Sequence, residues 1–296
     1  MVKIVSEIGI NHNGSVELCK KLIMISKMAG CDYVKIQKRN PDICVPDHQK
    51  STIKNTIWGQ MTYLEYKHKL EFNEDQIVEL FKYSNSLGIE LFASVWDIDS
   101  ALIMSKYTKI AKIPSAMITN LELCKYARSM FDMLIISTGM SNEEEIARCI
   151  DCCQPNVIMH TNSTYPCPVN ELNLNYIVHL NQLYGSKSEI GYSGHEYGLV
   201  TTFAAVAIGA KWIERHITLD KTMWGSDQQS SVEPVGMFKL VKGIRDIELA
   251  IQYQPGNRIE FDSEISKKNS LKYQPGNRIE FDSEISKKKQ SQILTK

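Results

Sequence analysis

Two histidines in the second half of the chain have the placement expected of metal ligands. His195 follows the apolar stretch 189–193, and His216 lies near the end of the stretch 211–218. The residues between them, 197–210, are rich in alanine and valine and are predicted to form a helix. A strand–helix–strand unit brings the ends of its two strands to the same edge of a parallel sheet. Two imidazoles at that edge suit a divalent metal, whereas either histidine alone would more simply be a packed or surface residue.

Two lysines lie inside other predicted strands. Lys35 and Lys112 either face the interior at a high desolvation cost, or lie with their stems along apolar surface and their ammonium groups in water. If both face inward at the same end of a sheet, their charges form a site for an anion. Hydroxyl groups that close neighbouring strands would complete a cradle for a phosphate or carboxylate. These hydroxyls belong to Ser94, Ser115 and Ser193.

The elements that must position these residues alternate between short apolar strands and helices. The predicted strands are 3–10, 32–37, 89–95, 109–115, 133–138, 156–162, 189–193 and 212–218. The predicted helices are 16–29, 75–87, 101–106, 120–130, 142–153, 174–183, 197–210 and 234–251. This alternation over about 250 residues predicts an α/β protein, a (β/α)8 TIM barrel, whose active residues lie at the C-terminal ends of the strands. An open doubly wound sheet is the alternative.

Two regions fall outside this alternation. Residues 38–72 show little periodicity and are predicted to form a long loop, which in a compact domain is usually functional and often a lid. Residues 252–296 form a short tail, predicted to be irregular, beyond the barrel domain 1–251. The tail contains the same 16-residue segment twice, at 253–268 and 273–288. Two short polar copies are too few to stack as a solenoid, and we expect the second copy to be poorly ordered.

Composition limits the classes of partner. The 296 residues include 34 Lys and Arg and 34 Asp and Glu, so the formal net charge is zero. Without a basic stripe, this balance argues against nucleic acid or an anionic membrane as a partner. The N-terminus has no signal-peptide pattern, and no apolar run reaches the length of a bilayer span, so we expect a cytoplasmic protein. The 8 cysteines are scattered without a metal-binding pattern and are expected to be reduced.

Six short motifs occur in order along residues 1–251. They are EIGINHNG at 7–14, VKIQ at 34–37, STGM at 137–140, GYSGH at 191–195, ERHIT at 214–218 and GSD at 225–227. Together they strongly resemble the sialic acid synthase family (N-acetylneuraminate synthases). The resemblance implies a barrel that condenses phosphoenolpyruvate and water with N-acetylmannosamine, or its 6-phosphate. The products would be N-acetylneuraminic acid, or its 9-phosphate, and inorganic phosphate.

The same resemblance assigns roles to individual residues. His195 and His216 match the ligands of a divalent metal, with Mn²⁺ as the expected ion and Mg²⁺ or Co²⁺ as alternatives. Glu7 matches a carboxylate beside the reacting carbons, and with the two histidines and Asp227 it completes the catalytic set. Gln37 and Asp227 match positions near the sugar. The positions that would hold phosphoenolpyruvate are Lys35, Ser94, Lys112, Ser115, Ser163, Tyr165 and Ser193.

The chemistry of this reaction agrees with these assignments. Phosphoenolpyruvate carries several negative charges, which accounts for two lysines and leads us to expect no acidic residue beside them at the strand ends. A metal held by only two imidazoles keeps open positions, where an aldehyde oxygen can bind to it as to a Lewis acid. Attack by the enol carbon leaves an oxocarbenium-like centre. An anionic Glu7 would stabilise that centre, or would orient or deprotonate the water that adds next.

The end of the chain departs from the family pattern. Family members continue into a small antifreeze-like domain, which in a homodimer supplies an arginine to the partner's sugar site. Here residues 267–271 resemble the entrance to that domain and the duplicated segment follows, so we expect the domain to be absent. Two further readings stay open. One is the same chemistry on a diacetamido sugar, giving a legionaminic- or pseudaminic-type acid, and the other is a barrel that binds ligand without useful turnover.

Overall fold

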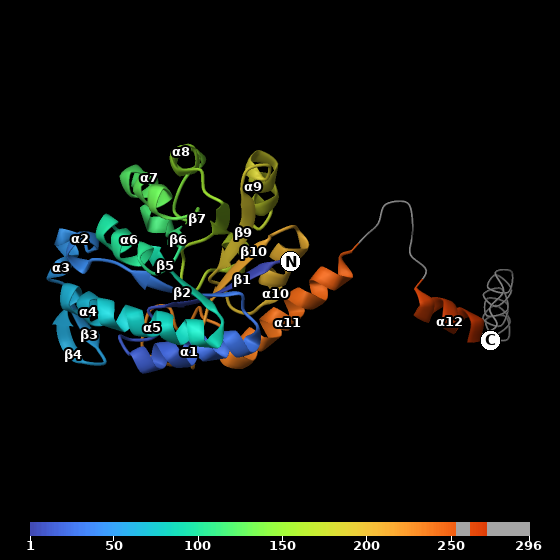
Figure 1. Cartoon of the computed structure of the whole chain (residues 1–296), viewed down its shortest axis with the longest axis horizontal. Helices are drawn as coiled ribbons and strands as arrows, with labels where there is room; N and C mark the ends of the chain where they lie inside the picture. The colour runs from blue at the N-terminus through green and yellow to red at the C-terminus, as the bar shows by residue number, and fades with distance from the viewer. Residues whose placement is uncertain (253–260, 271–296) are drawn as a thin grey trace, which may run out of the picture. The chain divides into compact units, whose positions relative to one another are not determined.

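Eight parallel strands close into a barrel in this computed structural model, which describes residues 1–252 and 261–270. The hydrogen-bonded order around the barrel is β1-β10-β9-β8-β7-β6-β5-β2, and β2 returns to β1 (Figure 1). The strands are β1 (Lys3–Gly9), β2 (Tyr33–Lys38), β5 (Glu90–Val95), β6 (Ile110–Ile113), β7 (Met133–Ser137), β8 (Val157–Thr161), β9 (Glu189–Gly194) and β10 (Trp212–His216). The predicted TIM barrel is confirmed, and the open sheet is excluded.

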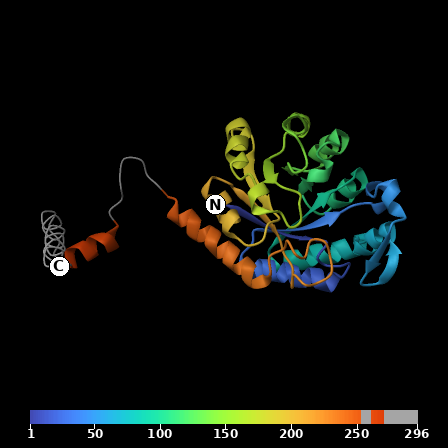
Figure 2. The same cartoon turned by 180° about the vertical axis from the view of Figure 1, so that it is seen from behind.

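The helices that alternate with these strands cover the outside of the barrel, as the views from opposite sides show (Figures 1 and 2). Local signals set their ends: the Ser15 side chain accepts a hydrogen bond from Leu18 N, and Gly30 ends the same helix at φ 89°. The helices are α1 (Val16–Ala29), α5 (Glu74–Leu87), α6 (Ile98–Ser105), α7 (Leu121–Met130), α8 (Glu143–Cys153), α9 (Tyr176–Tyr184), α10 (Val200–Ala207) and α11 (Pro234–Ala250).

The strands bury both of their faces, and alternation along each strand sorts the side chains between two layers. On β10, Trp212 packs inside the barrel, while Ile213 packs in the layer between strands and helices. The apolar floor of the barrel interior consists of Val5, Phe92, Ile110, Ile135, Val157, Met159 and Trp212. Above this apolar floor, toward the C-terminal ends of the strands, polar side chains such as Glu7, Lys35 and Lys112 occupy the interior positions.

The prediction of one long loop over residues 38–72 is wrong, because this segment folds into several short elements. They are α2 (Pro41–Cys44), α3 (Asp47–Lys50), an antiparallel hairpin of β3 (Ile53–Thr56) and β4 (Gly59–Thr62), and α4 (Tyr63–Leu70). Four-residue elements are too short to show a hydrophobic period. The reciprocal hydrogen bonds between Thr62 and Glu65 form a capping box that starts α4.

The tail also departs from the expectation of irregular structure. Within it, residues Asp262–Ser270 form helix α12, with Asp262 and Glu264 in the first turn. Acidic residues there interact favourably with the helix dipole. The remainder of the first copy and the whole second copy, 273–288, lie outside the described residues.

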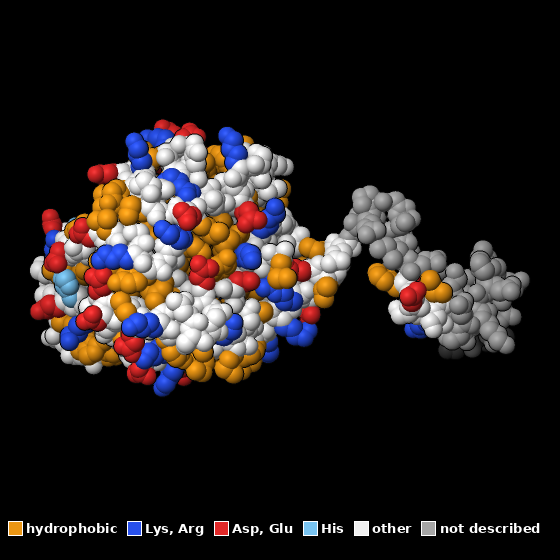
Figure 3. Space-filling model, in the orientation of Figure 1, with side chains coloured by type: hydrophobic (Ala, Val, Ile, Leu, Met, Phe, Trp, Pro, Cys, Tyr) orange, Lys and Arg blue, Asp and Glu red, His pale blue; other side chains and the backbone are white. Residues whose placement is uncertain are grey.

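Charges of both signs share the barrel surface. On the face seen in Figure 3, lysine and arginine side chains are interspersed with aspartate and glutamate side chains. This distribution agrees with the equal numbers of the two classes in the sequence. Within residues 1–252 and 261–270, every helix is too short or too polar to span a bilayer.

Candidate active site

A cavity of about 180 Å³ opens at the C-terminal ends of the strands. Every predicted site residue except Asp227 lines it. The predicted residues that line it are Glu7 on β1, Lys35 and Gln37 on β2, Ser94 on β5, Lys112 on β6, Ser115 in a 3-10 turn, Ser163 and Tyr165 after β8, Ser193 and His195 at the end of β9, and His216 on β10. Asp227 lies in the loop after β10, with its Oδ2 atom 3.7 Å from His216 Nδ1. Barrel closure therefore brings all the predicted residues together.

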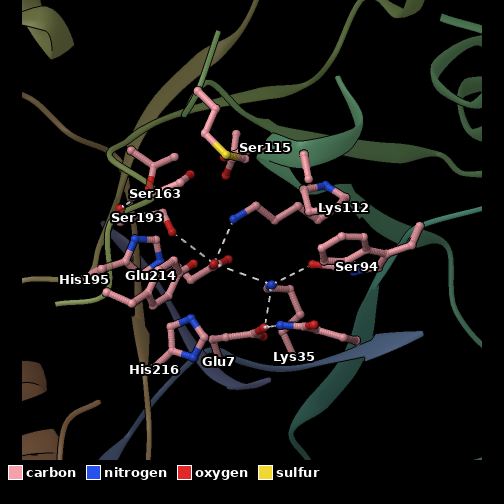
Figure 4. Close-up of a pocket in the computed structure, with 18 residues that line it drawn as sticks. Glu7, Lys35, Ser94, Lys112, Ser115, Ser163, Ser193, His195, Glu214 and His216 are labelled. Carbon is pink, nitrogen blue, oxygen red and sulfur yellow. Dashed lines mark hydrogen bonds and ion pairs between the residues drawn. The ribbon is translucent and has the colours of Figure 1, made fainter. Parts of the chain in front are cut away.

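Both lysines face inward, but an unpredicted carboxylate lies between them. Glu214 Oε1 is 2.7 Å from Lys112 Nζ and 3.5 Å from Lys35 Nζ, and it accepts a hydrogen bond of 3.1 Å from Ser193 Oγ (Figure 4). The expectation of no acidic residue beside the lysines is wrong. Alternation along β10 was the available signal: if His216 points into the barrel, the residue two positions earlier does so as well.

Lys35 connects Glu214 to a second carboxylate, that of Glu7. Lys35 Nζ lies 3.0 Å from Glu7 Oε2 and donates a 2.7 Å hydrogen bond to Ser94 Oγ. Gln37 Nε2 donates to Glu7 Oε1 at 3.2 Å. These side chains are almost completely buried, Gln37 excepted. Two lysines and two glutamates thus share one buried network, in which opposite charges compensate one another.

Burial and pairing act in opposite directions on the protonation of this network. For Glu214, burial opposes ionisation, but the ammonium groups of Lys112 and Lys35 outweigh it and lower its pKa to about 2. Burial alone would lower the pKa of Lys35, but the carboxylates of Glu214 and Glu7 outweigh burial and raise it. For Lys112, burial prevails over the attraction of Glu214 and lowers its pKa to about 8. Lys112 is therefore the cation of the pair that loses its proton first as the pH rises.

We expect the affinity of the cavity for phosphoenolpyruvate to fall about tenfold between pH 7 and pH 9, because a pKa of about 8 leaves Lys112 mostly neutral at the higher pH. The phosphate of such a ligand is already close to a dianion at pH 7. Calorimetric titration at the two pH values measures the change. Lys112→Met, which retains the stem but has no titrating group, should bind more weakly and lose this dependence. Equal affinities of the unmodified protein at both pH values would contradict the role of Lys112.

Each of the two histidines that line the cavity has a ring nitrogen without a hydrogen-bond partner in the described chain. His195 Nδ1 donates a 2.7 Å hydrogen bond to the Asn162 carbonyl, which leaves Nε2 as an acceptor. Burial, together with the neighbouring His216, holds the pKa of His195 well below its ordinary value, so the ring is neutral. His216 Nδ1 is buried without a hydrogen-bond partner.

The donor set of these histidines fits a divalent metal. The centroids of the two rings are 5.4 Å apart, and imidazole nitrogens that make no hydrogen bond to the protein are typical metal ligands. In the part of the chain that the structure describes, no group of three histidine, cysteine, aspartate or glutamate side chains is arranged to hold a metal. The protein would thus contribute two imidazoles and leave the other coordination positions to small molecules.

Gly139 allows two of the predicted hydroxyls to approach each other. A Cβ atom at this position would lie 2.3 Å from Ser163 Oγ and 2.9 Å from Ser115 Oγ, distances too short for unbonded atoms. The absence of a side chain in the loop after β7 therefore leaves room for both hydroxyls at the cavity wall, where they can donate to an anion.

Two motif residues serve the scaffold rather than the cavity. Arg215 is buried on the outer face of β10, where its Nη1 atom lies 3.0 Å from Glu196 Oε1. His12 stacks on Phe72 with ring centroids 4.2 Å apart, and burial, aided by Arg39, lowers its pKa to about 3. Arg215 thus ties the loop after β9 to β10, and His12 packs the loop after β1 against the segment that precedes α5.

Comparison with known proteins connects this geometry to one enzyme family. The family model described as the NeuB family matches residues 22–255. An N,N'-diacetyllegionaminic acid synthase of Campylobacter jejuni is 34% identical over 277 residues, which are 90% of this chain and 81% of that protein. An N-acetylneuraminate-9-phosphate synthase of Drosophila melanogaster is 35% identical over 266 residues, 87% of this chain and 71% of that protein.

The architecture is also similar to that of a solved structure. The N-acetylneuraminic acid (sialic acid) synthetase of Leptospira borgpetersenii, crystallised in complex with citrate, superimposes with a TM-score of 0.79 at 27% identity. The match covers 92% of this chain and 93% of that one.

Proposed function

The chain belongs to the NeuB family, and from this premise we propose that it is a metal-dependent nonulosonic acid synthase. The reaction joins carbon 3 of phosphoenolpyruvate to the aldehyde carbon of an N-acetylated hexosamine, adds water and releases inorganic phosphate. The observation that carries this proposal is the buried pair of inward-facing lysines beside two imidazoles with free nitrogen atoms.

Phosphoenolpyruvate binds at the lysine side of the cavity. Lys35 and Lys112 provide two ammonium groups, and Ser94 and Ser193 are already within hydrogen-bond distance of this network. Ser115, Ser163 and Tyr165 line the same cavity. Charged donors aimed at a fixed point bind phosphate and carboxylate oxygens more strongly than neutral ones do.

The acceptor aldehyde binds at the histidine side. His195 and His216 would hold the cation, and Mn²⁺ is the ion we propose. When bound, the cation supplies Lewis-acid polarisation of the aldehyde oxygen. Asp227 lies next to His216, at the end of the cavity where the sugar hydroxyls would lie.

Charge balance gives a physical reason for requiring the cation. Two lysines and two glutamates in the network sum to zero, whereas phosphoenolpyruvate brings several negative charges. A divalent ion at the histidines compensates part of this excess. Glu7, held by Lys35 and Gln37, lies at the same rim, where its charge can stabilise an oxocarbenium-like centre or its oxygen can orient the added water.

N-acetylmannosamine or its 6-phosphate is the acceptor that we propose first. A diacetamido sugar, giving a legionaminic- or pseudaminic-type acid, is the second candidate, because relatives of similar identity are named for both kinds of product.

We expect phosphate release from phosphoenolpyruvate to require both an acceptor sugar and Mn²⁺. The assay compares N-acetylmannosamine, its 6-phosphate and a diacetamido hexose, each before and after addition of a chelator, and mass spectrometry identifies the nine-carbon acid. Release that continues without sugar would contradict the synthase. No release with any sugar, despite clear binding of phosphoenolpyruvate, would favour a barrel that binds ligand without turnover.

A further inference from the structure

A second cavity, of about 630 Å³, opens beside the first. Its walls come from the β3–β4 hairpin, helix α4 and the loop that follows β10. The lining combines three lysines with aromatic rings, of which Tyr66 and Trp224 meet edge to face with centroids 5.2 Å apart. No residue of the described chain lines both cavities.

The three lysines of this cavity are Lys54, Lys67 and Lys221. Lys67 Nζ lies 5.1 Å from the Tyr63 ring centroid and 5.4 Å from that of Tyr66, and Lys54 Nζ lies 5.4 Å from the Tyr63 centroid. No aspartate or glutamate of the described chain lines the cavity, and no ion pair is found there for any of the three. In the first cavity, by contrast, each lysine forms an ion pair with a glutamate.

Lys67 is the most constrained of these cations. It is half-buried, and burial, together with Arg39, lowers its pKa to about 8, although the carboxylates of Asp227 and Glu71 act in the opposite direction. Rings stabilise an ammonium group less than a carboxylate or phosphate at hydrogen-bond distance does. The cavity therefore presents positive charge that a bound anion would compensate.

The second cavity adjoins the histidine side of the first. Trp224, Gly225 and Ser226 line it and lead directly into Asp227, whose carboxylate lies beside His216. A sugar with its aldehyde at the histidines must direct its remote end away from the lysine side, along this loop. Its last carbon then lies toward the second cavity, which this loop lines.

We propose that the second cavity binds a phosphate ester on the end of the acceptor sugar that is remote from the aldehyde. The inference rests on the proposed function and names its substrate class, a hexosamine 6-phosphate. Three positive charges complement a phosphate dianion, and the aromatic rings pack against the carbon skeleton that carries it. A neutral remote end would bring no negative charge to these three ammonium groups.

The test compares kcat/KM for N-acetylmannosamine 6-phosphate and for N-acetylmannosamine, with phosphoenolpyruvate and Mn²⁺ at fixed levels. The unmodified protein should prefer the phosphorylated sugar. In Lys67→Met the ratio should fall at least tenfold, mainly through KM, because the charged hydrogen bond to the phosphate is lost. Lys242→Met is the control, since Lys242 is an exposed residue of α11 that pairs with Asp246, and its ratio should stay unchanged.

Calorimetry without phosphoenolpyruvate separates this inference from the proposed function. Binding of the sugar phosphate that weakens in Lys67→Met supports the subsite, even if no sugar is turned over. Turnover that prefers N-acetylmannosamine or a diacetamido hexose, with a ratio insensitive to Lys67→Met, overturns the subsite and leaves the synthase intact. Absence of sugar-phosphate binding also overturns it.

Discussion

Replacement of Glu7 by glutamine should lower kcat by a factor of about 10² to 10⁴, the range for loss of one positioned acid–base group. Glutamine has nearly the same shape, so its amide oxygen can still accept from Lys35, although its amide nitrogen cannot accept the hydrogen bond from Gln37 Nε2. What disappears is the negative charge next to the reacting carbons and the ability to take a proton from water. Binding of phosphoenolpyruvate should change far less, because Lys35 keeps its contacts with Glu214 and Ser94.

Steady-state kinetics and calorimetric titration of phosphoenolpyruvate separate these two effects. Glu17→Gln is the control, because Glu17 forms an exposed ion pair with Lys20 on α1, and its kcat should equal that of the unmodified protein. Full turnover by Glu7→Gln, with the affinities for metal and phosphoenolpyruvate unchanged, would remove Glu7 from the mechanism.

Replacement of Glu214 by glutamine should lower the free energy of unfolding by about 3–5 kcal/mol, the range for loss of one partner from a buried ion pair. Lys112 and Lys35 remain buried in this variant, and only Glu7 is left to compensate them. Phosphoenolpyruvate can replace part of the missing negative charge. Its addition should therefore raise the midpoint of thermal unfolding more in Glu214→Gln than in the unmodified protein.

Urea unfolding at pH 7 measures the loss, and its pH dependence tests the cause. The Glu214 pKa is lowered from 4.5 to about 2 on folding, so the carboxylate stabilises the fold above pH 4.5 and loses this effect as the pH falls through 2. The difference between the two proteins should shrink over that interval. Glu144→Gln, at an exposed pair with Arg148, should change stability by less than about 1 kcal/mol. A similarly small effect for Glu214→Gln would contradict the buried network.

The internal ion pairs of the cavity oppose the binding of an anionic substrate. In the free protein, Glu214 occupies the donors of Lys112 and Ser193 that an incoming anion would use. An anion would therefore compete with an internal carboxylate, and we expect a cation bound at the histidines to favour the anion in that competition.

Local sequence signals were sufficient for the alternation of strands and helices and for much of the site. Ser15 and Gly30 mark the two ends of α1, and the short apolar runs mark the strands, because these signals act within a few residues of chain. His195 and His216 were recognisable as a pair for the same reason: a single strand–helix–strand unit places both. The segment 38–72 was misread because its elements are each too short to carry a period.

The partners of each site residue were decided by tertiary structure. Lys112 and Glu214 are 102 positions apart, and nothing near either residue specifies the other. Closure of the barrel and the register of its strands place Glu7 beside Lys35 and His216, and Glu214 beside Ser193. The second cavity likewise requires a hairpin after β2 to meet the loop after β10. Side-chain identity determines which chemistry is available, but the pairing of charges depends on distances across the barrel, which local sequence does not encode.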